Sequence, residues 1–150
     1  MEFTIEREVF LAGIQKTLGI VERENAMPIL QHLLIRTKED GIEIVARDRE
    51  IGIITGHEAS VIREGALTLP ARKLYETVRE LQGETLHLSE DVTCTAKLTS
   101  NKAVCRLHGM PAEDYPTTDR EEVCSFGIKA IMLREMIRKV SFAVSTDETR

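Results

Sequence analysis

The stretch that decides the fold is Phe3-Thr4-Ile5-Glu6-Arg7-Glu8-Val9-Phe10-Leu11-Ala12-Gly13-Ile14, at the start of the chain. Its first part predicts a short strand over residues 2–6, and apolar residues then recur at helical spacing over residues 7–19. The same order returns near the end of the chain, where Phe126 and Ile128 take the places of Phe3 and Ile5. A repeat at a fixed spacing indicates a duplicated domain.

The residues between these two copies contain a second strand–helix unit. After the first helix, runs rich in Ile, Leu and Val are separated by turn residues, which is typical of antiparallel strands. A helix follows over residues 70–82, with Pro70 in its first turn, where the missing N–H costs nothing. We therefore predict an α+β fold of duplicated strand–helix–three-strand units, with helices on one face of antiparallel sheets. The expected strands are 29–37, 42–46, 51–58, 66–69, 84–88, 92–98 and 102–108.

An acidic segment with two prolines, residues 111–122, separates this duplicated part from the final repeat. We expect residues 1–121 to form a first domain. Residues 122–150 would then be the first strand and helix of a second domain, with the helix over residues 129–143. A lone amphipathic helix cannot bury its own apolar stripe, so we interpret this second part as truncated.

Charge is distributed unevenly between the predicted elements. The chain has 150 residues and a net charge of −5, which argues against coating nucleic acid by bulk charge. The three predicted helices nevertheless carry nine basic and four acidic residues, so a surface made of helices could attract a polyanion. Lys and Arg also favour exposed helix faces without any function. The nine basic residues are Arg7, Lys16, Arg72, Lys73, Arg79, Lys129, Arg134, Arg138 and Lys139.

No cluster of residues points to catalysis, a metal or a cofactor. Cys94, Cys105 and Cys124 have no metal-ligand spacing, and Cys94 and Cys105 lie in predicted strands, where a thiol acts as a small hydrophobe. Catalytic motifs for hydrolases, metalloproteases and nucleotide binding are absent. The chain has no membrane-spanning apolar run, and its opening residues are too charged for a signal peptide, so we expect a cytoplasmic, non-enzymatic protein.

Five segments in one order resemble the bacterial sliding clamp family, the beta subunits of DNA polymerase III. The segments are Met1-Glu2-Phe3-Thr4-Ile5-Glu6-Arg7-Glu8, Met27-Pro28-Ile29-Leu30, Leu69-Pro70-Ala71-Arg72-Lys73, Met110-Pro111-Ala112-Glu113-Asp114-Tyr115-Pro116 and Phe142-Ala143-Val144-Ser145-Thr146-Asp147-Glu148-Thr149-Arg150. The resemblance implies a DNA-clamp fold and a subunit of three similar domains. Two subunits would form a head-to-tail ring that encloses duplex DNA and tethers the replicative polymerase, with no chemistry of its own.

The resemblance also implies roles for single residues. Arg72 and Arg79 match family positions near the DNA, and Arg23 lies one place from a basic loop position of the family. Arg134, Arg138 and Lys139, which belong to the second domain's helix, are added from charge and periodicity.

Further family positions lie at the joints of the ring. Lys73, Cys105 and Leu107 match positions at the joint between subunits, although Cys105 replaces a frequent aromatic residue. Alternation equally allows Cys105 and Leu107 to face the core. Arg150 would lie at the margin of the family's pocket for polymerase and clamp-loader peptides.

Two other classes of function remain open from the residues alone. One is a stand-alone α/β domain that oligomerises through an exposed strand edge and binds a protein or a small ligand. The other is an enzyme, for which no convergent acid, base or nucleophile is evident. Sequence-independent contact with the phosphates of a duplex fits the charge distribution better than base reading, because no helix-turn-helix pair is present.

Overall fold

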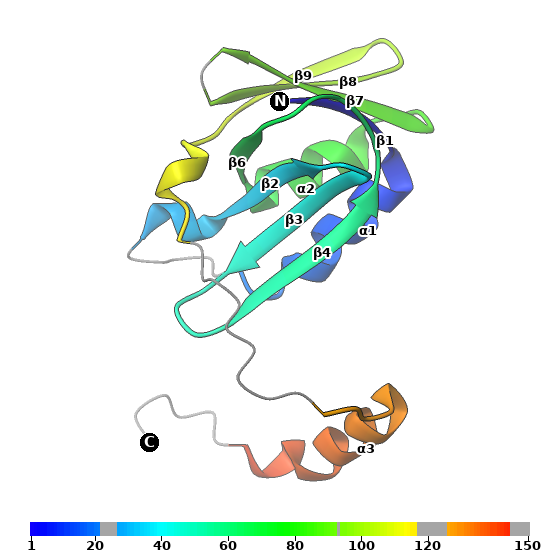
Figure 1. Ribbon diagram of the computed structural model, residues 1–150, viewed down its shortest axis with the longest axis vertical. Helices are drawn as coiled ribbons and strands as arrows, with labels where there is room; N and C mark the ends of the chain where they lie inside the picture. The colour runs from blue at the N-terminus through cyan, green and yellow to red at the C-terminus, as the bar shows by residue number, and fades with distance from the viewer. Residues whose placement is uncertain (22–26, 93, 117–125, 145–150) are drawn as a thin grey trace. The chain divides into compact units, whose positions relative to one another are not determined.

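The computed structural model describes residues 1–21, 27–92, 94–116 and 126–144, and the chain divides into two units (Figure 1). The first unit is Met1–Pro116 and the second is Thr117–Arg150. The first unit holds two antiparallel sheets and two helices, which confirms the predicted α+β fold class.

The larger sheet has five strands in the order β5-β1-β7-β8-β9. Its central region is built on β1, where Phe3 pairs with Val61 on one side and with Leu88 on the other. Because alternate residues of a strand point to opposite faces, Phe3 and Ile5 enter the core together. The strands are β1 (Glu2–Glu6), β5 (Ser60–Arg63), β7 (Thr85–Val92), β8 (Thr95–Ser100) and β9 (Ala103–His108).

The smaller sheet has four strands in the order β4-β3-β2-β6. Leu33 and Ile35 of its central strand β2 and Ile42 and Ile44 of β3 are almost fully buried on the core side. A one-residue slip would turn these side chains to the opposite face, so the alternation fixes the register. The strands are β2 (His32–Lys38), β3 (Gly41–Arg47), β4 (Gly52–Glu58) and β6 (Ala66–Pro70).

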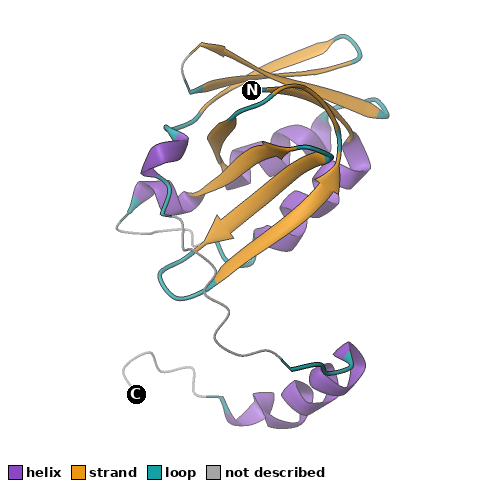
Figure 2. Cartoon of the chain, in the orientation of Figure 1, coloured by secondary structure: helices purple, strands orange, loops and turns teal. Residues whose placement is uncertain are grey.

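The helices α1 (Arg7–Thr17) and α2 (Ala71–Glu80) contact each other and lie together on one side of the four-stranded sheet (Figure 2). Each helix turns a stripe of apolar side chains inward. Phe10 and Ile14 of α1 and Leu74 and Val78 of α2 are fully buried, as their spacing predicts. Their opposite faces are left to solvent, and these faces carry Lys16, Arg72, Lys73 and Arg79.

The predicted strand 92–98 is wrong in its first part. β7 continues to Val92 and β8 begins at Thr95, and Cys94 adopts a positive φ of 60° in the connection. The alternation of apolar residues continues through this tight turn, so periodicity alone could not place it. Cys94 is therefore a turn residue, whereas Ala96 and Leu98 are buried strand residues as predicted.

Two further differences concern strand ends and number. The predicted strand 29–37 begins with a 3-10 turn, η1 (Pro28–Gln31), because Pro28 sets a helical φ and gives no N–H to a ladder. The predicted strand 51–58 is followed by the separate strand β5, which leaves the smaller sheet and pairs with β1 in the larger one. The first repeat thus supplies strands to both sheets.

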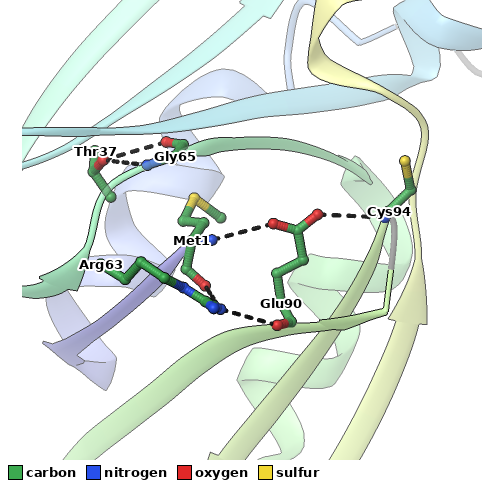
Figure 3. Close-up of polar contacts among 6 residues, drawn as sticks. All are labelled: Met1, Thr37, Arg63, Gly65, Glu90 and Cys94. Atoms are coloured by element: carbon green, nitrogen blue, oxygen red, sulfur yellow. Dashed lines mark hydrogen bonds and ion pairs between the residues drawn. The ribbon is translucent and has the colours of Figure 1, made fainter.

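The two sheets are joined near Met1, as Figure 3 shows. The ammonium group of Met1 lies 3.1 Å from Glu90 Oε2, and Arg63 donates to the carbonyl oxygens of Met1 and Glu90 at 3.4 and 3.2 Å. On the other side of Met1, the Gly65 N–H donates to Thr37 Oγ1 at 2.9 Å, and Thr37 belongs to the smaller sheet. An ion pair and hydrogen bonds therefore link the two sheets at the end of the core near Met1.

A second junction involves the segment after β9. Thr68 of β6 and Met110 form an isolated antiparallel bridge, and the Gly109 N–H donates to the Cys94 carbonyl at 2.7 Å. The short turn η2 (Ala112–Asp114) then leads to Tyr115, which is 2% exposed and packs on Leu34. Burial raises the pKa of Tyr115 to about 12, so its hydroxyl stays protonated at neutral pH.

The second unit contains the helix α3 (Ala130–Val140) and the short turn η3 (Ser141–Ala143). Residues 126–129, where the repeat predicts a strand, form no strand among the described residues. A strand needs a hydrogen-bonded neighbour, and the described part of this unit offers none. The apolar stripe of α3 is exposed, which agrees with the expectation that a lone helix cannot bury itself.

Candidate nucleic-acid interface

The outer face of α2 carries the exposed basic side chains Arg72, Lys73 and Arg79. Ala71, Leu74 and Val78 form the buried stripe, so the residues between them must point away from the core. Arg72 and Arg79 are seven residues apart, which places them on the same helix face, about 10 Å apart along its axis. This spacing is suited to two separate phosphate contacts.

The three cations of α2 differ in their neighbours. The guanidinium of Arg79 lies 3.1 Å from Glu80 Oε1 and 5.8 Å from the centre of the Tyr75 ring. Within the described part of the chain, Arg72 and Lys73 make no hydrogen bond or ion pair. The charges of Arg72 and Lys73 are therefore the most available on this helix.

A groove of about 180 Å³ lies beside the first turn of α2, between Val21, His32, Pro70 and Arg72. Pro70 precedes the helix and supplies no side-chain cap to its first turn. Nδ1 of His32 lies 3.1 Å from Thr68 Oγ1, and burial lowers the pKa of His32. His32 is consequently neutral at pH 7, and the positive charge here comes from Arg72 and Lys73.

The first helix contributes less positive charge than the sequence suggests. Lys16 is exposed near the end of α1, but Arg7 is only 19% exposed and forms an ion pair with Glu8. The Arg7 side chain also donates to carbonyl groups at the end of α2. Once Arg7–Glu8 and Arg79–Glu80 are counted as pairs, the cations left on the first unit's helices are Lys16, Arg72 and Lys73. The surface is thus weakly basic.

Lys16 has an electrostatic effect on the neighbouring strand. Burial, and secondarily the charge of Lys16, lower the pKa of His57 on β4, whose ring lies where a side chain at Gly13 of α1 would have to go. We expect the urea midpoint to be constant above about pH 6.5 and to fall as the pH is lowered toward 5.5. The unfolded chain binds the proton at the ordinary pKa of about 6.5, whereas the folded chain resists it.

The control for this pH dependence is His57→Gln, which removes the titrating group. This variant should flatten part of the fall between about pH 6.5 and 5.5, and the half-buried His32 should account for a further part. An identical slope in His57→Gln and in the parent chain would show that His57 does not carry the dependence.

The basic residues predicted on the second helix unit lie together on α3. Arg134, Arg138 and Lys139 are all exposed there, and Arg138 and Lys139 occupy the last turn. Positive side chains in the last turn favour the helix dipole, which gives them a local role in any case. Arg23, Arg150 and Cys124 lie outside the described residues.

The residues predicted at the subunit joint lie on or near an edge strand. β9 is the last strand of the larger sheet, so one side of its backbone has no partner strand among the described residues. Cys105 and Leu107 are partly buried and pack on the core, whereas Val104 is 50% exposed. Both side chains thus lie on the core side of β9 and stay partly exposed at this edge, and Lys73 is exposed on α2, which contacts β9.

Other kinds of site find no support among the residues that the structure describes. Cys94 and Cys105 are free thiols, and no group of three or more His, Cys, Asp or Glu side chains converges as metal ligands there. None of the helices described is long and apolar enough to cross a membrane.

Comparison with known proteins identifies the family to which this fold belongs. Residues 1–119 match the family described as DNA polymerase III beta subunit, N-terminal domain. The chain therefore belongs to the family of DNA polymerase III beta subunits.

Individual relatives agree with this assignment. A beta sliding clamp of Chlamydia pneumoniae is 30% identical over 151 aligned residues, which cover 100% of this chain and 41% of the relative. The sliding clamp of Bacillus subtilis superposes with a TM-score of 0.95 at 29% identity, covering 100% of this chain and 42% of that one. The beta subunit of Caulobacter crescentus gives a TM-score of 0.93 at 31% identity, covering 99% and 40%. This chain spans about two fifths of the length of these relatives.

Sequence reasoning missed the fixed role of Arg7. The charge count includes Arg7 among the basic residues of the helices, but its side chain donates to the carbonyls of Val78 and Gly83 at the end of α2. Its place as the first residue of α1, directly after a strand, gave no signal of this contact, because the partner carbonyls lie more than seventy residues away in the chain.

Proposed function

We propose that this chain forms part of a ring-shaped processivity factor that encircles duplex DNA and tethers a replicative polymerase, without catalysing a reaction. The observation that carries the proposal is the family match over residues 1–119. The relatives that cover the whole chain are named beta sliding clamps. The exposed Arg72 and Lys73 of α2 supply the local positive charge that such a role needs.

The proposed contact with DNA is weak and independent of sequence. Three available cations on the helices of the first unit can approach phosphates, and each contact is worth little in water. A side chain that gripped one base would hinder sliding, whereas contacts with phosphates repeat along the duplex. Arg79, Arg134, Arg138 and Lys139 would add to this attraction, as would Arg23.

We further propose that residues 1–121 act as a first clamp domain and residues 122–150 as the start of a second. The division of the chain after Pro116 supports this boundary. The edge strand β9 would then pair with a second subunit in a head-to-tail ring, with Lys73, Cys105 and Leu107 at the joint. Partner-peptide contact at Arg150, and a cytoplasmic location, are parts of the same proposal.

The experiment that tests a ring is topological. The complete product of the gene that encodes this chain, loaded on nicked circular duplex, should remain bound through gel filtration. Cutting the circle once should release it, because a ring slides off a free end. Equal retention on circular and linear DNA would contradict encirclement, and the uncut circle incubated in parallel controls for slow dissociation.

A further inference from the structure

Arg7 is the first residue of α1, but its side chain reaches the far end of α2. Nε of Arg7 donates to the Gly83 carbonyl at 3.1 Å, and Nη1 approaches the Val78 carbonyl at 3.5 Å. The backbone N–H of Arg7 donates to the Glu84 carbonyl at 2.8 Å. One residue of α1 thus contacts three carbonyls between the last turn of α2 and the start of β7.

The Val78 carbonyl lies in the last turn of α2, where a helix leaves carbonyls without partners, and the Gly83 carbonyl follows shortly after the helix ends. A guanidinium at this position satisfies them and also opposes the negative end of the helix dipole. The planar fork of Arg can serve two carbonyls at once, whereas the ammonium of Lys acts as a single point charge. The 81% of the Arg7 side chain that is shielded from solvent makes this geometry hard to replace.

The same segment is held from its other side. Ser100 of β8 is 2% exposed, and its Oγ lies 2.9 and 2.8 Å from the carbonyl oxygens of Gln82 and Thr85, which share its one hydroxyl proton. Gly83 has a φ of +130°, and a Cβ at this position would lie 2.7 Å from Ser100 Oγ. The chain after α2 is therefore fixed between α1 and the larger sheet.

Arg79 belongs to the last turn of α2. In the sequence it lies between Val78 and Gly83, whose carbonyls accept from the Arg7 side chain. We propose that Arg7 is a positioning residue for DNA contact, which acts by fixing the end of α2 and the direction of Arg79 rather than by contributing its own charge to phosphates. This inference rests on the proposed function, because it assumes that the α2 face meets duplex DNA.

The test compares two charge-conserving substitutions, Arg7→Lys and the control Arg106→Lys. Arg106 is an exposed residue of β9, on the strand face opposite to the core-packed Cys105 and Leu107, with one ion pair to Asp91. Duplex affinity of the chain is measured by fluorescence anisotropy at several salt concentrations. Arg7→Lys should weaken binding about fivefold with an unchanged slope of log K against log salt, because the contact of Arg79 with phosphate is weakened but not removed. Arg106→Lys should bind like the parent chain.

A double-mutant cycle with Arg79→Gln separates positioning from stability alone. If Arg7 directs Arg79, the loss caused by Arg79→Gln should be smaller in the Arg7→Lys background, because the contact is already impaired. Additive losses would overturn the proposal. So would parent-like affinity of Arg7→Lys, or a salt slope that falls by about 0.9 in Arg7→Gln, which would mark a direct phosphate contact.

If the Arg7→Lys variant does not fold, Ser100→Ala replaces it in the test. This variant removes the hydroxyl that holds the chain after α2 from its other side, and it changes no charge. It should likewise weaken duplex binding at constant slope, and parent-like binding would overturn the proposal. A parent chain that binds no duplex even at low salt would overturn the proposed function and the role of Arg7 together. If the parent chain binds duplex DNA and the variants bind it equally well, only the role of Arg7 is overturned.

Discussion

Arg72→Glu is expected to weaken binding of duplex DNA about tenfold or more at low salt, with no change in the urea midpoint. Arg72 is exposed on the first turn of α2 and, among the described residues, has no ionic partner. A surface charge pair is worth about 1 kcal/mol in water, so replacing attraction by repulsion changes the binding free energy by about twice that amount. The loss should shrink as salt is raised.

The matched control is Lys102→Glu, which changes the net charge equally but lies in the turn between β8 and β9. Its affinity should stay near that of the parent chain. Equal losses in both variants would show that only the total charge matters, and the α2 face would then have no special role. Anisotropy with two duplexes of unrelated sequence tests in addition whether binding is independent of sequence.

The largest loss of stability is expected for Gly109→Ala. A Cβ at this position would lie 1.7 Å from the Thr68 carbonyl oxygen and 3.3 Å from that of Cys94. Both neighbours are backbone atoms, so no side-chain rotation can relieve the clash. We expect the free energy of unfolding in urea to fall by about 3 kcal/mol, the upper range for overpacking.

Gly56→Ala is the matched control for this substitution, since no atom lies within 4 Å of its added methyl group. Its free energy of unfolding should change by less than about 1 kcal/mol. If both variants had the same stability, the close approach of Gly109 to β6 would not be a constraint of the fold in solution.

The sequence predicted the repeated order of elements because local periodicity and turn residues carry that information. The buried residues Phe10, Ile14, Leu74 and Val78 follow directly from helical spacing. The turn at Cys94 was misplaced because its apolar neighbours keep the alternation of a continuous strand. The pairing of β5 with β1 depends on a neighbour far along the chain, which local pattern does not identify.

The candidate interface was predicted less completely than the fold. Exposure of Arg72, Lys73 and Arg79 follows from their positions between buried residues of α2. The pairing of Arg79 with Glu80 and the use of Arg7 at the end of α2 depend on side-chain directions in the folded unit. A count of charges could not distinguish the available cations from those already occupied.

The place of β1 in the larger sheet has a consequence for synthesis of the protein. Its residue Phe3 pairs with Val61 and Leu88, so β1, which is synthesised before both of these partners, must wait for them. Closing such long loops before any pairing is gained makes folding slow. During this delay β1 exposes two hydrogen-bonding edges, and a nascent chain in that state is vulnerable to aggregation until β7 has emerged.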